Sequence, residues 1–416
     1  MIRKVHRARF ILADPDLVLQ DATVHVGDPG RICRVEPWHG VHPGSDIELT
    51  DWGSAVIIPG LVNAHSHLEL TGLHDELTGT RSFVKWLAEV VRRRREWTPD
   101  DYLQSARAGA RMALESGTTL VGDISASGLT QGALSGTKLR AMIFEEVLGL
   151  APEGTGKVLT ELERRIARNE SDPLLTGGVS PHAPYSVSSQ LYRGVAELAK
   201  RKALPLATHL AESRAELELL ASGTGELRDF LSQMAVLPKE WTAPGRSPVR
   251  YLESLGVLEN APLLIHCNYV DADSIAPILG GHCSVAYCPR SHSFFGHETH
   301  PVRDLLDAGI NVALGTDSLA SNDSLSMLDE MRFLRRKRTD LKSDEIFRMA
   351  TINGATALGF GSTLGRLRRG CWADMAVLSL PENTSGKYLA SQILEGSGEC
   401  IATIVRGELA WQKIER

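Results

Sequence analysis

Two hydrophobic patterns divide the chain. In the middle, short apolar runs alternate with stretches whose apolar residues recur with a helical period, as in a succession of strands and helices. Eight runs are typical of buried strands: 55–58, 118–122, 139–144, 177–179, 204–208, 263–265, 284–287 and 310–314. Helical patterns accompany them at 82–95, 101–116, 156–168, 188–202, 271–279, 302–308 and 326–338. This alternation predicts an α/β fold with a parallel sheet, and eight repeats favour a (β/α)8 TIM-type barrel over a doubly wound sheet.

The two ends of the chain follow a different pattern, in which short strands are broken by turns. Residues 22–26 are an example near the start, and residues 400–405 are similar near the end. We therefore predict a small composite β-sandwich domain built from residues 1–57 and 366–416, joined to a barrel of residues 58–365.

One connection within the predicted barrel is long. Residues 223–256 include Pro238, Pro244 and Pro248. Long connections in compact domains are often functional, so this segment is a candidate lid.

Composition and charge narrow the classes of function. The 416 residues are 43% hydrophobic and 23% charged, which is typical of a globular protein. The net charge of −6 gives no general basic surface for nucleic acid, and the arginine-rich runs 92–95 and 335–338 lie in helical patterns as solvated faces. The apolar run 10–13 is too short for a signal sequence, no segment approaches a membrane span, and the six cysteines lack disulfide-scaffold spacing. We therefore expect a cytoplasmic protein with neither a nucleic-acid nor a membrane partner.

Polar residues suited to metal binding and proton transfer follow five of the expected strands. His65 and His67 come after the first strand, and residues i and i+2 of an extended chain point to the same side. The others are His182 after the fourth strand, His209 and Glu212 after the fifth, His266 after the sixth and Asp317 after the eighth. The carboxyl ends of barrel strands form one rim, where barrel enzymes have their active sites. Five imidazoles and a carboxylate at that rim predict a metal site.

The predicted ligands are His65, His67, His209 and Asp317. Three neutral nitrogens and one carboxylate oxygen suit Zn2+, with Fe2+ or Mn2+ as alternatives. Zinc lowers the pKa of a bound water towards about 7, which makes that water a nucleophile at neutral pH.

Three residues of the set can assist the reaction of this water. Glu212 lies three residues after His209 and can carry protons between the water and the substrate. His266 can hydrogen-bond the water or polarise the reacting centre, and Asp317 can accept the water's proton. The chemistry predicted by these residues is hydrolysis at an electrophilic carbon.

The chain resembles the amidohydrolase superfamily in the order of its polar residues, which is His65-Ser66-His67, His209, His266 and Asp317. The similarity extends over nearly the whole chain, including the composite β domain. Superfamily members with two metals use a carbamylated lysine on the fourth strand. Residues 176–190 contain no lysine, so the resemblance implies one divalent metal per chain, as in the deaminase branch.

Within that branch, three segments look like those of enzymes that deaminate adenine nucleosides: 182–186, 209–213 and 315–317. Four segments look most like the aminodeoxyfutalosine deaminases of menaquinone biosynthesis: 67–69, 82–87, 144–149 and 317–325. Deaminases of methylthioadenosine and S-adenosylhomocysteine resemble the chain at Trp86, but they place a ribose-binding glutamate where this chain has Arg95. Glu96 is next to that position, and Glu89 lies one turn earlier.

The resemblance implies attack of the activated water on C6 of an adenine, giving a 6-oxo product and ammonia. Glu212 would donate a proton to N1, and Asp317 would take a proton from the water. His182 would contact the sugar or the edge of the ring.

Three further residues are substrate-binding candidates. Trp86 either covers the base or is a buried core residue of its amphipathic helix. Glu69 and Ser321 belong to the matching segments and complete the expected substrate contacts.

The substrate that the resemblance favours is 6-amino-6-deoxyfutalosine, which would become futalosine. The alternatives are a deaminase of methylthioadenosine, S-adenosylhomocysteine or adenosine, and then a guanine- or triazine-type aminohydrolase or chlorohydrolase. A non-catalytic assembly protein is disfavoured because no expected ligand is missing. The expected partner is a small purine nucleoside-type molecule, and the question of a homodimer is left open.

Overall fold

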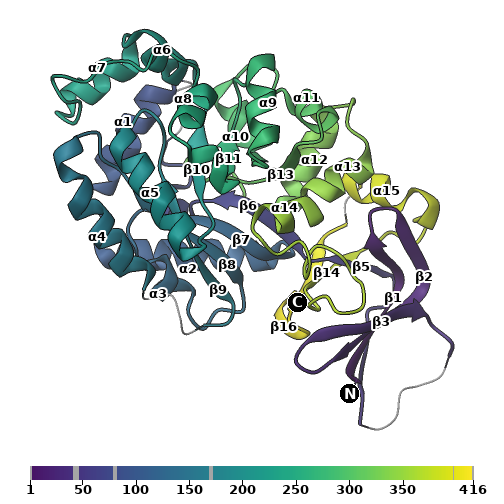
Figure 1. Ribbon diagram of the computed structural model, residues 1–416. Helices are drawn as coiled ribbons and strands as arrows, with labels where there is room; N and C mark the ends of the chain where they lie inside the picture. The colour runs from purple at the N-terminus through teal and green to yellow at the C-terminus, as the bar shows by residue number, and fades with distance from the viewer. Residues whose placement is uncertain (1, 41–45, 78–81, 168–171, 397, 415–416) are drawn as a thin grey trace.

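The structure is a computed structural model that describes residues 2–40, 46–77, 82–167, 172–396 and 398–414 (Figure 1). Its central strands form two parallel sheets of four. One sheet contains β6 (Leu61–Ser66), β7 (Thr118–Ser125), β8 (Arg140–Val147) and β9 (Leu175–Pro181). The other contains β10 (Ala207–Leu210), β11 (Leu263–His266), β12 (Ser284–Tyr287) and β13 (Asn311–Leu314). Parallel bridges join the sheets at both seams, Val179 to Leu206 and Ser66 to Asp317, so the strands close into the predicted (β/α)8 barrel.

Helices cover the outside of the barrel (Figure 1). The seven predicted helices correspond to α1 (Phe83–Arg94), α2 (Pro99–Glu115), α4 (Thr155–Ile166), α5 (Ser189–Lys202), α9 (Ala272–Gly280), α11 (Val302–Asp307) and α12 (Met327–Lys337). Residue 168, at the end of one predicted helix, lies outside the described residues. Several of these helices begin where a short polar side chain accepts a hydrogen bond from the first turn, as Ser82, Thr98, Ser188, Asp271 and Ser326 do.

Further short α-helices lie between these elements. They are α3 (Thr130–Leu134), α6 (Arg214–Ser222), α7 (Glu226–Gln233), α8 (Pro248–Ser254), α10 (Pro289–Phe295), α13 (Ser343–Met349), α14 (Ile352–Ala357) and α15 (Leu389–Glu395). The long connection 223–256 therefore contains two helices, α7 and α8. Leu227 and Leu231 of α7 pack in the same apolar cluster as Trp86 of α1, so this segment is folded onto the rim of the barrel. Its role as a lid stays a prediction. None of the described helices is long and apolar enough to cross a membrane.

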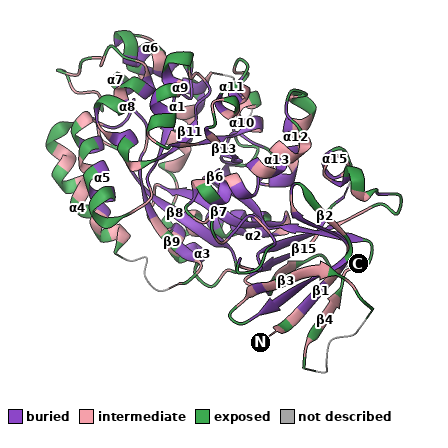
Figure 2. Cartoon of the chain, turned by 45° about the vertical axis from the view of Figure 1, so that its right-hand side comes forward, coloured by how far each residue is buried: buried purple, intermediate pink, exposed green. Residues whose placement is uncertain are grey.

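Strands from both ends of the chain form one eight-stranded sheet. Its members are β1 (Ile2–Asp14), β2 (Leu17–Gly27), β3 (Arg31–Pro37), β4 (Glu48–Asp51), β5 (Ala55–Pro59), β14 (Met375–Ser379), β15 (Cys400–Val405) and β16 (Glu408–Gln412). The order is β16-β15-β14-β5-β1-β2-β3, with β4 also paired to β1. The sheet folds over on itself, because the N–H of Ile32 in β3 donates to Cys371 O at 2.8 Å, just before β14. Figure 2 shows the buried faces of this sheet and of the barrel strands.

The apolar run at 55–58 was predicted to be the first barrel strand, and this prediction is wrong. The run is β5, which pairs with β14 and β1, whereas the first barrel strand is β6. Val56, Ile57 and Ile58 are all 0% exposed because both faces of β5 are covered. A strand that is buried on both faces loses its polar alternation, so its sequence resembles that of a barrel strand.

A buried ion pair connects the barrel to the sheet. Arg140, at the start of β8, donates to both carboxylate oxygens of Asp374, from Nε at 3.1 Å and from Nη2 at 3.2 Å. The N–H of Arg406 adds a third hydrogen bond to Asp374 at 2.8 Å. Both charged side chains are buried, and their bidentate geometry satisfies each of them.

Candidate metal centre and active site

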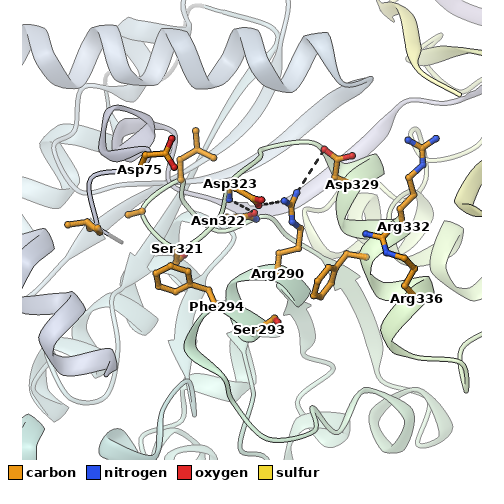
Figure 3. A pocket seen from close by; sticks show the side chains of 14 residues that line it. Asp75, Arg290, Ser293, Phe294, Ser321, Asn322, Asp323, Asp329, Arg332 and Arg336 are labelled. Atoms are coloured by element: carbon orange, nitrogen blue, oxygen red, sulfur yellow. Dashed lines mark hydrogen bonds and ion pairs between the residues drawn. The ribbon is translucent and has the colours of Figure 1, made fainter. Parts of the chain in front are cut away.

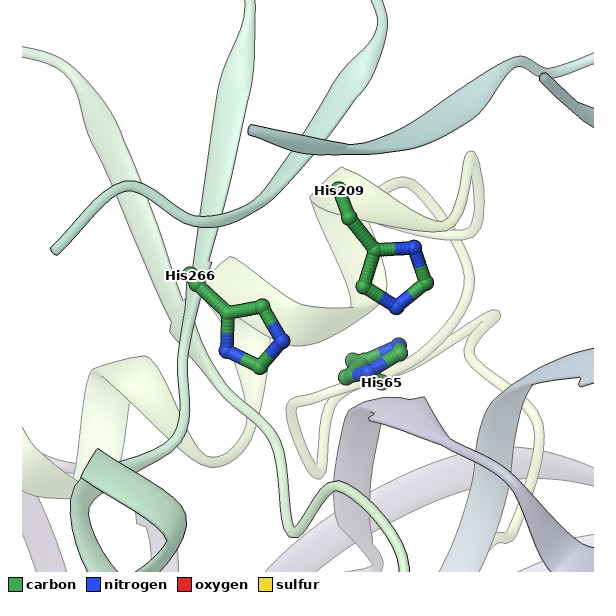
Figure 4. Close-up of side chains that lie close together, drawn as sticks. All are labelled: His65, His209 and His266. Carbon is green, nitrogen blue, oxygen red and sulfur yellow. The ribbon is translucent and has the colours of Figure 1, made fainter. Parts of the chain in front are cut away.

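Histidines from three barrel strands face one another at the carboxyl ends of those strands (Figure 4). The rings of His65, His209 and His266 have centroids 5.0, 5.4 and 5.5 Å apart in pairs. His67 joins them, with its Nε2 3.2 Å from Nε2 of His209. Asp317, in the loop that follows β13, places Oδ1 3.5 Å from Nε2 of His65 and 3.7 Å from Nε2 of His67. The structure therefore brings together all four predicted metal ligands and His266.

A bulge in β6 aims His65 and His67 into the barrel. Val62 and Ala64, lower in the same strand, belong to the apolar core inside the barrel. Between Asn63 and Ser66 the register shifts, because three steps along β6 match only two along β7. The extra residue reverses which side chains point inwards, so the odd-numbered histidines replace the even-numbered core residues.

The donor atoms of this cluster fit a divalent metal. Both ring nitrogens of His65 are buried and have no hydrogen-bond partner among the described residues. Burial, with the neighbouring imidazoles, lowers the pKa of His67 and His209 well below the usual value, so both rings are neutral ligands. The carbonyl of His182 accepts a hydrogen bond from Nδ1 of His209 at 3.2 Å, which leaves the lone pair at Nε2 for a metal.

Asp317 is oriented by two serines. Ser291 of α10 donates from Oγ to Asp317 Oδ2 at 2.7 Å, and Ser321 donates to the same oxygen at 2.8 Å. Oδ1 is therefore the oxygen that faces the imidazoles. Although burial opposes ionisation, the nearby imidazoles of His65, His266 and His67 hold the pKa of Asp317 below its usual range. Sequence reasoning missed Ser291, although its place just after the seventh barrel strand was an available signal.

Glu212 and His266 form a second pair beside the ligands. Oε1 of Glu212 lies 3.4 Å from Nε2 of His266, and the Glu212 side chain is buried. Burial, followed by the nearby charges of Asp317 and Glu216, raises the pKa of Glu212 well above its usual value. Burial also lowers the pKa of His266 to about 3. These directions favour the protonated form of Glu212 and the neutral form of His266.

Glu216 and Asn268 hold the backbone of Glu212 in place. The Glu212 N–H donates to Glu216 Oε2 at 2.8 Å, and Asn268 Nδ2 donates to the Glu212 carbonyl at 2.9 Å. Sequence reasoning missed both residues, because nothing in their spacing indicates which backbone groups they meet.

His182 lies at the rim beside His209, with its ring centroid 4.9 Å away. Its Nδ1 is 2.6 Å from Ser186 Oγ, and its Nε2 is 4.0 Å from Oε1 of Glu146, a buried residue of β8. Burial lowers the pKa of His182 to about 3 and raises that of Glu146 to about 7. Glu146 was not singled out from the sequence, although it lies in the segment 144–149 that carried part of the resemblance.

The other substrate-binding candidates differ in their positions. Ser321 contacts Asp317, as described above. Trp86 is buried, packs on Phe295 with ring centroids 5.1 Å apart, and donates from Nε1 to the carbonyl of Ala320 at 2.7 Å. The structure does not bring Glu69 into the histidine cluster. The substrate-binding role of Glu69, like those of Trp86 and Ser321, stays a prediction.

The Glu69 carboxylate is instead occupied by the loop after β7. It accepts hydrogen bonds from the N–H groups of Ala126 and Ser127 at 3.2 and 3.1 Å, and from Ser127 Oγ at 2.7 Å. Arg94 Nη2 lies 3.4 Å from the same carboxylate. In this arrangement Glu69 fixes a loop.

A cavity of about 750 Å³ lies next to the segment 319–323 (Figure 3). Its lining includes Arg290, Arg332 and Phe294, together with Ser321, but none of the clustered histidines. Ser321 thus contributes both to this cavity and to the hydrogen bonds around Asp317.

Comparison with known proteins assigns the family. The model of the amidohydrolase family matches residues 56–410. The chain belongs to the amidohydrolase family. This amidohydrolase is 34% identical over 365 residues to the aminodeoxyfutalosine deaminase of Deinococcus radiodurans, covering 85% of this chain and 83% of that protein. It is 31% identical over 379 residues to the 5-methylthioadenosine/S-adenosylhomocysteine deaminase of Pelotomaculum thermopropionicum, covering 88% and 81%.

Solved structures share the fold of this amidohydrolase. The Helicobacter pylori aminofutalosine deaminase in complex with methylthio-coformycin aligns with a TM-score of 0.85 and 23% identity, covering 98% of this chain and 100% of that one. An adenosine deaminase of Xanthomonas campestris with bound zinc aligns with a TM-score of 0.82 and 23% identity, covering 98% and 92%. With its family established, the amidohydrolase is an enzyme, a hydrolase that acts on carbon–nitrogen bonds.

Proposed function

We propose that the chain is a zinc-dependent deaminase that converts the 6-amino group of an adenine nucleoside-type substrate into a 6-oxo group and releases ammonia. The observation that carries this proposal is the convergence of His65, His67, His209 and Asp317 on one point beside the Glu212–His266 pair. Zinc in a neighbour of the same fold supports the choice of metal, and the deaminases among the relatives support the reaction.

The two carboxyl groups, Asp317 and Glu212, have different roles in the proposed reaction. Zinc, held by the three histidines and Asp317, would lower the pKa of a water molecule and so supply the nucleophile. As the water oxygen bonds to C6, Asp317 takes a proton from it and Glu212 gives its proton to N1 of the ring. Asp317 then protonates the amino nitrogen, the C6–N bond breaks, and the remaining hydroxyl proton restores Glu212. The neutral His266 hydrogen-bonds the oxygen on C6.

Within this class we propose 6-amino-6-deoxyfutalosine as the substrate, supported by the 34% identical relative and by the sequence segments that resemble that subgroup. Methylthioadenosine and S-adenosylhomocysteine form the second candidate, because the 31% identical relative is named for them.

A substrate panel tests both proposals. Ammonia release would be measured with aminodeoxyfutalosine, methylthioadenosine, S-adenosylhomocysteine, adenosine and guanine, and kcat/KM compared. We expect the highest value for aminodeoxyfutalosine. A higher value for methylthioadenosine or S-adenosylhomocysteine would select the second candidate, and turnover of guanine alone would contradict the nucleoside class.

Removal of the metal tests the chemistry. A preparation dialysed against a chelator should lose ammonia release and regain it when about one equivalent of Zn2+ per chain is added. Full activity in metal-free protein would contradict the proposal.

A further inference from the structure

Glu146 presents a buried acceptor oxygen to Nε2 of His182, which lies half-buried at the rim, and no hydrogen bond joins the two atoms. Oε1 of Glu146 has no hydrogen-bond partner among the described residues and lies 4.0 Å from Nε2 of His182, which is too far for a direct hydrogen bond. A buried acceptor that lacks a donor is costly, so a partner from outside the chain is expected here.

The hydrogen bonds around His182 determine which of its nitrogens carries the proton. Ser186 donates its hydroxyl hydrogen to the carbonyl of Ala183 at 3.1 Å, so its Oγ is an acceptor towards Nδ1 of His182 at 2.6 Å. Nδ1 therefore carries the hydrogen, and Nε2 presents a lone pair. Nε2 is therefore not a donor to Glu146, in keeping with the 4.0 Å between it and Glu146 Oε1.

Glu146 is aimed into the barrel by the alternation of β8. The preceding residue, Glu145, points outwards, where Arg165 donates to it from Nε at 2.7 Å. Glu146 points to the opposite side, within 4.8 Å of ligand nitrogens of both His182 and His209. The two acceptors therefore stand at the edge of the metal centre, within reach of a molecule that is bound there.

We propose that Glu146 and His182 together bind a vicinal diol of the substrate, one hydroxyl donating to each acceptor. Two neighbouring hydroxyl groups bring two donors a short distance apart, which matches two acceptors 4.0 Å apart. The inference rests on the proposed nucleoside substrate, whose ribose carries such a diol. It also provides a sugar contact in a chain that has Arg95 where related deaminases place a ribose-binding glutamate.

A second divalent cation is the rival occupant, since Glu146, His182 and His209 form a possible ligand group by distance. His209 is poorly suited to it, because its Nδ1 already donates to His182 O and its Nε2 faces His67. Such a cation would keep only two protein ligands.

The test compares adenosine with 2′-deoxyadenosine and 3′-deoxyadenosine, each measured as a substrate and as a competitive inhibitor of the best substrate in the panel. In the wild type, loss of a hydroxyl that binds Glu146 should reduce kcat/KM or affinity by about 10- to 100-fold. In Glu146→Gln this penalty should shrink to less than about threefold, while zinc content is unchanged. Glu146→Asp, which keeps the charge but shortens the reach, should give an intermediate penalty and replaces the Gln variant if that variant does not fold.

Glu145→Gln is the matched control, because it removes the neighbouring carboxylate that faces Arg165. It should leave the ratio between adenosine and its deoxy analogues at the wild-type value. A full deoxy penalty in Glu146→Gln would overturn the diol proposal while the deaminase function stands. Two metal ions per wild-type chain, falling to one in Glu146→Gln, would overturn it in favour of the cation. If the wild type neither deaminates nor binds any panel nucleoside, the proposed function itself fails.

Discussion

Glu212 and Asp317 are buried carboxyl groups at the same rim, yet their pKa values move in opposite directions. Burial is the main cause of the raised pKa of Glu212, and the nearby charges of Asp317 and Glu216 raise that pKa further. At Asp317 the surrounding imidazoles outweigh burial. The two shifts favour a protonated Glu212 and an ionised Asp317, which is the arrangement that the proposed acid and base require.

Replacing Glu212, the proposed acid, should lower the rate of the reaction without changing the binding of the metal. In Glu212→Gln we expect unchanged zinc content and unfolding temperature, but a kcat at least about 100-fold lower, because the amide cannot give a proton to N1. Ammonia release and metal analysis measure the two effects. Glu218→Gln, at an exposed position on α6, is the control and should retain wild-type kcat. Near-normal turnover in Glu212→Gln would reject the proton-donor role.

Ser291 should affect metal binding and activity by orienting Asp317 rather than by contacting the substrate. Without its hydroxyl, Asp317 Oδ2 loses a 2.7 Å hydrogen bond and the carboxylate can rotate away from the histidines. For Ser291→Ala we expect zinc affinity or kcat to fall by about 10-fold, as is usual for groups that orient a metal ligand. Competition with a chelator measures the affinity. Ser293→Ala, exposed on the same helix, should have no effect, and equal behaviour of the two variants would contradict the role of Ser291.

At the scale of elements, the positions of the site residues could be predicted because each lies at or shortly after the carboxyl end of a strand, and parallel strands end at one rim. The pairing of His65 with His67 followed from their spacing. The bulge that turns them inwards could not be predicted, because it depends on the register between β6 and β7. The assignment of β5 failed for a related reason, since its apolar run fits two different sheets equally well. The hydrogen bond of Ser291 to Asp317 and the position of Glu146 beside His182 depend on contacts between segments distant in sequence, which local patterns do not contain.

Helix α12 should make stability depend on pH. Glu330, fully buried in its first turn, accepts hydrogen bonds from Asn322 Nδ2 at 2.7 Å and from the Arg290 N–H at 3.1 Å. Burial raises its pKa to about 8 from an ordinary 4.5. Because the folded pKa is the higher one, this group's stabilising contribution is complete below about pH 4.5 and is lost as the pH rises towards 8.

The free energy of unfolding should therefore decline less steeply between pH 5 and 8 in Glu330→Gln than in the wild type. Chemical denaturation at several pH values provides the measurement. Glu153→Gln, at an exposed position, serves as control and should follow the wild-type curve. Parallel curves for wild type and Glu330→Gln would show that this carboxyl group does not titrate as described.

For the molecule as a whole, the Arg140–Asp374 pair is a buried polar link between the barrel and the composite sheet. Asp374→Ala leaves a buried guanidinium unpaired and should lower the free energy of unfolding by about 3–5 kcal/mol. The double variant Arg140→Met, Asp374→Leu removes both charges and should be less destabilised than the single one. Denaturant titration of the three proteins tests this, and a double variant as unstable as Asp374→Ala would contradict it.

The pairing of β5 with β14 also has a consequence for folding during translation. The ribosome translates Val56 and Ile58 long before the strand that pairs with theirs, Met375–Ser379. Until then β5 offers an apolar edge on which another nascent chain can pair wrongly. A product that terminates between residues 330 and 374 would carry every residue of the proposed active site. We expect it to aggregate nonetheless, because β14, the partner strand of β5, was never translated.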